Sequence, residues 1–179
     1  MGLEHALSQP VHWQSALLGL DDQRLIGVSL AACSRLVLPY WEAHNHRDDK
    51  MEDVVSAMTA WVRDRSPKSQ QRVLNSLQRV AVQSHGYLSP VWPVPPGTNC
   101  PGDHAGDSIV AAANAITEIG HSDFTHRAED CLDSAAHAVS QMIGHRQPDD
   151  EATDFWTQAI ERIRLGIIKQ LQDWELYAT

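Results

Sequence analysis

Between residues 49 and 65, apolar side chains recur at the spacing of one helix face. A period of 3.6 residues places these side chains on one side of a helix, where they must be buried against other elements. The segment therefore predicts an amphipathic helix inside a helical fold. The apolar positions fall at i, i+3, i+4, i+7, i+10 and i+11, and they are Met51, Val54, Val55, Met58, Trp61 and Val62.

The same period continues along most of the chain, and no segment has the alternating pattern of a strand. At 179 residues the chain suits one domain with its own core. We therefore expect an all-α fold, a single-domain bundle of about six helices that spans residues 1–179, with a short helix in the first twenty residues. The six longer helices are expected over residues 25–38, 49–65, 67–86, 105–120, 123–144 and 149–174.

Helix starts and ends have their own local signals. Asp22 can cap the first long helix, and Ser66 followed by Pro67 is typical of a helix start. Pro39 has no N–H to donate and clashes with the preceding turn, so a kink or an end is expected near Leu38. Glycines are expected to close three helices, at positions 86, 120 and 144.

Residues 87–103 have a different composition. The segment holds five prolines and two glycines, has no helical period, and is longer than most loops in compact domains. It also contains Trp92 and other apolar residues, which do not suit a free linker. We interpret it as a proline-rich strap packed across the bundle, with a functional lid as the alternative, and it separates two three-helix halves.

The overall composition is acidic, with 23 Asp and Glu against 14 Lys and Arg and a formal net charge of −9. Such a field disfavours nucleic acid and anionic membranes, and it favours basic proteins. Three cysteines without a close pair (Cys33, Cys100 and Cys131) argue against a disulfide framework and a zinc knuckle. We expect a cytoplasmic protein, since no apolar run reaches the length of a membrane span.

Catalytic and cofactor motifs are weak or absent. Residues 27–31 read GVSLA, which approaches a hydrolase nucleophile elbow but lies inside an expected helix. Ten histidines leave a helical-bundle metal site, built from His121, His126 and His137, as an alternative, although the paired Glu-x-x-His pattern of di-iron bundles is missing. We predict no catalytic residue, no bound metal and no cofactor.

Clustered carboxylates are the more informative feature. Like charges one turn apart repel on a helix, and a basic partner would relieve that repulsion. We therefore predict that the acidic clusters contact a partner protein, together with an aromatic anchor in the strap. The predicted partner-binding residues are Asp48, Asp49, Glu52, Asp53, His46, Asp149, Asp150, Glu151, Asp154 and Trp92.

Residues 31–64 resemble the N-terminal signature of a small all-helical immunity-protein family of bacterial polymorphic toxin systems. In that signature, a helix with a Cys, a basic residue and Leu-Pro leads through an Asp-Asp-basic corner into a helix that ends in Ala-x-x-Trp. A second uncharacterised bacterial helical family has a similar early Ala-Cys and Arg run and a Trp-rich last helix. The positions that match the immunity-protein signature are Cys33, Arg35, Leu38, Pro39, Asp48, Asp49, Lys50, Ala57 and Trp61.

The resemblance implies an immunity protein that binds and neutralises a cognate toxin by occluding its active site, with no chemistry of its own. A toxin that acts on nucleic acid would carry a basic cleft, so a nuclease is the leading expectation for the partner. Two other hypotheses for the function stay open: a metal-dependent enzyme of the helical-bundle type, and a helical protein of unassigned cellular role.

Overall fold

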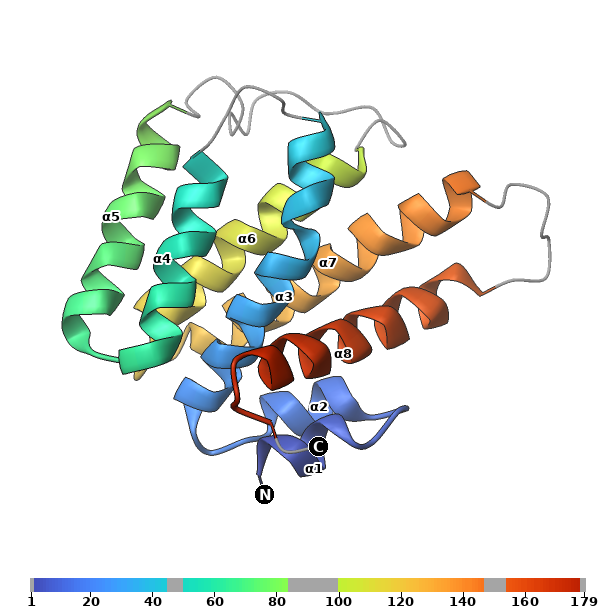
Figure 1. The fold of residues 1–179 in the computed structure, drawn as a ribbon, viewed down its shortest axis with the longest axis horizontal. Helices are drawn as coiled ribbons and strands as arrows, with labels where there is room; N and C mark the ends of the chain where they lie inside the picture. The colour runs from blue at the N-terminus through green and yellow to red at the C-terminus, as the bar shows by residue number, and fades with distance from the viewer. Residues whose placement is uncertain (1, 45–49, 84–99, 147–153, 178–179) are drawn as a thin grey trace.

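The fold was analysed in a computed structural model that describes residues 2–44, 50–83, 100–146 and 154–177. Within these ranges the chain forms eight α-helices and no strand (Figure 1), which confirms the all-helical fold class. The helix count differs from the six expected because the N-terminal segment forms two short helices before the six longer ones. The helices are α1 (Leu3–Leu7), α2 (Trp13–Leu18), α3 (Gln23–His44), α4 (Lys50–Asp64), α5 (Pro67–Gln83), α6 (Pro101–Thr117), α7 (Phe124–Arg146) and α8 (Phe155–Asp173).

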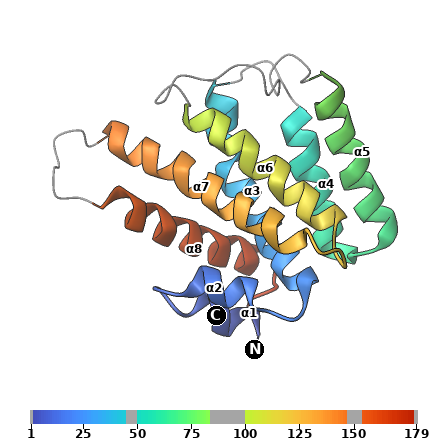
Figure 2. The same cartoon turned by 180° about the vertical axis from the view of Figure 1, so that it is seen from behind.

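Helix α3 is the centre of the bundle. It packs against α4, α6, α7 and α8. Of these, α6, α7 and α8 lie side by side across it (Figures 1 and 2). Helix α5 pairs with α4 at one side, and the α1–α2 pair lies at the end of the bundle beside the C-terminal end of α8. No helix within the described ranges is long and apolar enough to cross a membrane.

The central position of α3 follows from its composition. Every residue from Ile26 to Ser34 is buried, and the small residues among them let neighbouring helices approach on all sides. The two serines cost little there because Ser29 and Ser34 donate to backbone oxygens one turn earlier, at 3.3 and 3.0 Å. A nucleophile elbow at residues 27–31 is not formed, because Ser29 lies in the middle of the helix.

Helix α3 does not end near Leu38. It continues through Pro39 to His44, and the extra turns pack on the first turns of α6. A methyl group added at Gly106 would lie 2.7 Å from the ring of Trp41, so the two helices touch at that point. Packing of this kind offsets the hydrogen bond that Pro39 removes.

The local signals for helix 50–64 and for the caps are confirmed. All six apolar residues of the α4 stripe are buried. Asp22 accepts a hydrogen bond from the Arg24 N–H at 2.9 Å, and the Ser66 hydroxyl accepts one from the Ser69 N–H at 3.1 Å. Neutral and charged caps of this type stabilise a helix by about 1 kcal/mol.

Two expected helix ends are wrong. Helix α6 stops at Thr117 instead of reaching Gly120, which lies in the following turn with a φ of +92°. Helix α7 passes Gly144, whose missing side chain faces the ring of Phe155, and ends at Arg146. Tertiary contacts with the neighbouring helix can therefore carry a helix past a glycine.

The proline-rich segment is described only at its end. Residues 84–99, including Trp92, lie outside the described residues, so the strap and lid interpretations are untested. Residues 101–103 are helical rather than part of a loop, since Pro101 occupies the first turn of α6. The Asp103 carboxylate accepts from the Cys100 N–H at 3.2 Å and completes a capping box.

Candidate functional site

Only three of the ten predicted partner-binding residues lie in the described part of the chain. They are Glu52, Asp53 and Asp154, and all three are exposed. Figure 1 places the start of α4 and the start of α8 at different corners of the bundle, so these residues do not form one surface. The other seven lie outside the described residues: His46, Asp48, Asp49, Trp92, Asp149, Asp150 and Glu151.

Asp154 has a structural role as the N-cap of α8. Its Oδ1 accepts hydrogen bonds from the backbone N–H groups of Trp156 and Thr157, each at 3.1 Å. Hydrogen bonds from the Thr157 hydroxyl and from these amides lower the pKa of the Asp154 carboxyl. A carboxylate at this position also stabilises the positive end of the helix dipole.

Asp53 lies beside a cation contributed by α5. Its Oδ2 is 3.7 Å from Nη1 of Arg79, and the two side chains are 63% and 66% exposed. An ion pair this exposed contributes little to stability. Glu52, one residue earlier, forms no hydrogen bond or ion pair with any described residue.

A shallow groove of ≈ 370 Å³ separates α4 from α5 at this point. One wall is Asp53, Ala57 and Ala60 of α4, and the other is a polar stripe of α5. The stripe was not predicted from the sequence, because the apolar period of the third long segment (67–86) indicates only its buried face. The stripe has helical spacing and consists of Arg72, Asn75, Ser76 and Arg79.

Charge is unevenly divided between the two helical hairpins. Residues 50–83, which form α4 and α5, carry six basic and three acidic residues, a net charge of +3. Residues 100–146, which form α6 and α7, carry two basic and seven acidic residues, a net charge of −5. The negative field of the protein is therefore strong at the α6–α7 hairpin, which sequence reasoning did not single out.

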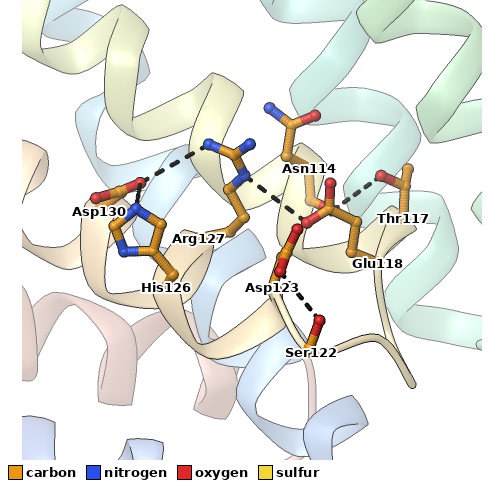
Figure 3. Close-up of polar contacts among 8 residues, drawn as sticks. All are labelled: Asn114, Thr117, Glu118, Ser122, Asp123, His126, Arg127 and Asp130. Atoms are coloured by element: carbon orange, nitrogen blue, oxygen red, sulfur yellow. Dashed lines mark hydrogen bonds and ion pairs between the residues drawn. The ribbon is translucent and has the colours of Figure 1, made fainter.

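Part of this negative charge is neutralised near the α6–α7 turn (Figure 3). The Arg127 guanidinium lies between two carboxylates, with Nε 3.7 Å from Glu118 Oε2 and Nη1 3.9 Å from Asp130 Oδ2. The ring of His126 approaches the same Asp130 oxygen at 3.7 Å. Arg127 thus interacts with two acids and neutralises one of the three negative charges that Glu118, Asp123 and Asp130 contribute near this turn.

Three other carboxylates of the hairpin are not neutralised. Asp107 of α6 and Glu129 and Asp133 of α7 are exposed and form no hydrogen bond or ion pair with any described residue. Partial desolvation raises the pKa of Asp107, and the neighbouring His104 opposes that rise. These three acids are available to a partner.

Three rings from three helices meet beside Asp107. The rings of His104 (α6) and His137 (α7) are stacked with centroids 5.1 Å apart, and His137 lies 4.8 Å from the ring of Trp156 (α8). Burial lowers the pKa of His104, and the nearby His137 lowers it further, whereas Asp107 and Asp103 raise it. At neutral pH, His104 is therefore an uncharged aromatic surface next to acidic groups.

The histidines proposed as metal ligands are not brought together. His126 contacts Asp130, whereas His137 contacts His104 and Trp156. The two residues are eleven positions apart on α7, about 16 Å along the helix axis. Among the described residues, no group of three or more His, Cys, Asp or Glu side chains has an arrangement that could hold a metal ion.

Comparison with known proteins identifies no family for this chain. No family model matches it, and neither the curated proteins nor the solved structures include a significant match.

Proposed function

We propose that this protein binds a basic partner protein and that, as the resemblance of residues 31–64 implies, the partner is a toxin whose active site it covers. The observation that supports this best is the acidic α6–α7 hairpin, whose exposed Asp107, Glu129 and Asp133 form no ion pair with any described residue. Unpaired surface acids strengthen long-range attraction to a cationic surface, and on binding they pair without first breaking an internal ion pair.

The binding surface in this proposal extends from Asp107 across α7 to Glu129 and Asp133. The half-buried Trp156 lies at its edge through the ring cluster with His137. Interfaces typically combine such a charged rim with a few aromatic anchors. The acidic residues at the start of α4 remain a second predicted contact.

The experiment uses the toxin domain that this proposal expects to be encoded beside the protein, with association rates measured by stopped-flow fluorescence at low and at high salt. A variant with Asp107, Glu129 and Asp133 replaced by Lys should associate about tenfold or more slowly at low salt, because charge reversal removes steering. The effect should shrink at high salt, where the attraction is screened.

A matched control separates this surface from net charge. Replacing three exposed acids elsewhere with Lys changes the net charge equally, and it should slow association much less. Equal slowing by both triple variants would assign the effect to net charge alone, and no binding by the unaltered protein would reject the toxin-neutralising role. The control positions are Asp21, Glu42 and Glu175.

A further inference from the structure

We infer that the α4–α5 groove is a second binding site, and that its ligand is an acidic peptide segment with two carboxylates about two helical turns apart. The groove has the opposite charge to the α6–α7 hairpin, so it would take a different partner from the basic one proposed above. Three features of the groove support this site: the register of its two walls, its weakly engaged donors and its shape.

The two walls face each other in antiparallel register. Asp53 lies opposite Arg79, as their 3.7 Å approach shows. Since α4 and α5 run in opposite directions, Ala60 lies at the other end of the groove, on the side of Arg72. Arg79 is seven positions after Arg72, which places the two cations about 10 Å apart along α5.

The donors of the groove are only weakly engaged within the described part of the chain. Arg72 forms no hydrogen bond or ion pair with any described residue, and its charge is one of the minor causes that lower the pKa of Asp64. Among the described residues, Arg79 has only long contacts, at 3.3 Å to the Ser76 hydroxyl, 3.4 Å to the Asn75 carbonyl oxygen and 3.7 Å to Asp53. Guanidinium groups donate paired hydrogen bonds to carboxylates, so each arginine can bind one acidic side chain.

The shape of the groove favours a peptide over a small anion. The α4 wall contributes the methyl groups of Ala57 and Ala60, which leave room between the helices. Asn75 accepts a hydrogen bond from Gln71 at 3.0 Å through its side-chain oxygen, and its amide nitrogen donates to no described residue. A segment that lies along the groove would place a carboxylate on each arginine and a polar group opposite Asn75.

Asp53 has a distinctive role in this site. In the free protein its Oδ2 is 3.7 Å from Nη1 of Arg79, so an incoming acidic side chain must compete with it. Replacing Asp53 with Asn should therefore strengthen binding, whereas replacing either arginine should weaken it. If Asp53 and Arg79 formed only a structural ion pair, replacing Asp53 and replacing Arg79 would not change peptide binding in opposite directions.

The test measures binding of fluorescently labelled helical peptides to the full chain by anisotropy at low salt. The first peptide carries Glu at positions i and i+7, the second carries Glu at i and i+4, and the third carries Gln in place of both acids. We expect the first peptide to bind several-fold more tightly than the second and far more tightly than the third. Equal affinity for the first two peptides, or no binding of the first, would overturn the two-point site.

Single substitutions then locate the site. Arg72→Gln and Arg79→Gln should each weaken binding of the first peptide by about 3–10-fold, the loss of one charge-assisted contact. Asp53→Asn should strengthen it, and Arg63→Gln, at an exposed arginine of α4 outside the groove, should change it less than about twofold. Equal weakening by Arg63→Gln, or weaker binding by Asp53→Asn, contradicts the proposal. Circular dichroism confirms that each variant is folded.

Discussion

Arg164 is the one charged side chain that is buried within the described residues, with 9% of its surface exposed. Its Nη1 donates to the carbonyl oxygen of Leu7 at 2.6 Å, and its Nε and Nη2 donate to the two carboxylate oxygens of Glu161 at 2.7 and 2.6 Å. The bond to Leu7 joins α8 to the last residue of α1, 157 positions away in the chain. Arg164 should therefore hold the N-terminal helix on the bundle.

Substitution of Arg164 by Met tests this role, because Met keeps an unbranched apolar stem and removes the donors. A charged hydrogen bond to a buried carbonyl contributes about 1.5–3 kcal/mol, and the half-exposed pair with Glu161 adds roughly 0.3–0.5 kcal/mol. We expect the free energy of unfolding to fall by about 2–3 kcal/mol in urea titrations. In a domain of this size that lowers Tm by roughly 5–10 °C. Amide exchange in α1 should also accelerate.

Glu161→Gln is the matched control, because it leaves the Arg164 bond to Leu7 in place. It should cost less than about 1 kcal/mol. If Glu161→Gln is as destabilising as Arg164→Met, the ion pair rather than the contact with Leu7 carries the stability, and the reasoning is refuted.

The Arg164–Glu161 pair should also make the stability of the protein depend on pH. Hydrogen bonding to Arg164 lowers the pKa of Glu161 below its ordinary value of 4.5. The stability from this pair is therefore complete above pH 4.5 and is lost as the pH falls through the lowered folded-state pKa. Arg164→Met should flatten the stability curve in that acidic range.

Two further substitutions and one reagent test the packing against Trp41, the ring cluster and the exposure of the cysteines. Gly106→Ala should lower the stability. Overpacking against the Trp41 ring costs about 1–3 kcal/mol, whereas the gain in helix propensity is only about 1 kcal/mol. Thermal unfolding measures the difference. The stability of the protein should decrease as pH falls below 6.5, because His104 has a lowered pKa in the folded state and resists protonation. His104→Gln should reduce that dependence, and NMR titration of the ring should give a midpoint below 6.5. In the folded protein, iodoacetamide should modify Cys100 before the two buried cysteines, as peptide mass spectrometry would report.

Features that depend on neighbours in the chain were predictable from the sequence. The period of residues 51–62 identified the buried face of α4, including Trp61, because a helix converts spacing directly into direction. Asp22 and Ser66 marked two helix starts, since a cap bonds to amides two or three residues away. The all-helical class followed from the same local patterns.

Features that depend on contacts between distant segments were decided only in the folded structure. Pro39 stays inside α3 because the turns after it pack on the glycines of α6, and no local rule contains that contact. His104, His137 and Trp156 form one cluster although more than fifty residues separate the first from the last.

The candidate sites divide in the same way. The sequence by itself determined that the protein is helical, acidic and rich in clustered carboxylates, because composition and period are properties of single segments. It could not show that Asp53 faces Arg79 across a groove, or that Glu129 and Asp133 form no ion pair with any described residue while Asp130 lies beside Arg127. Whether a surface charge is neutralised depends on which helix packs beside it, and only the tertiary structure decides that.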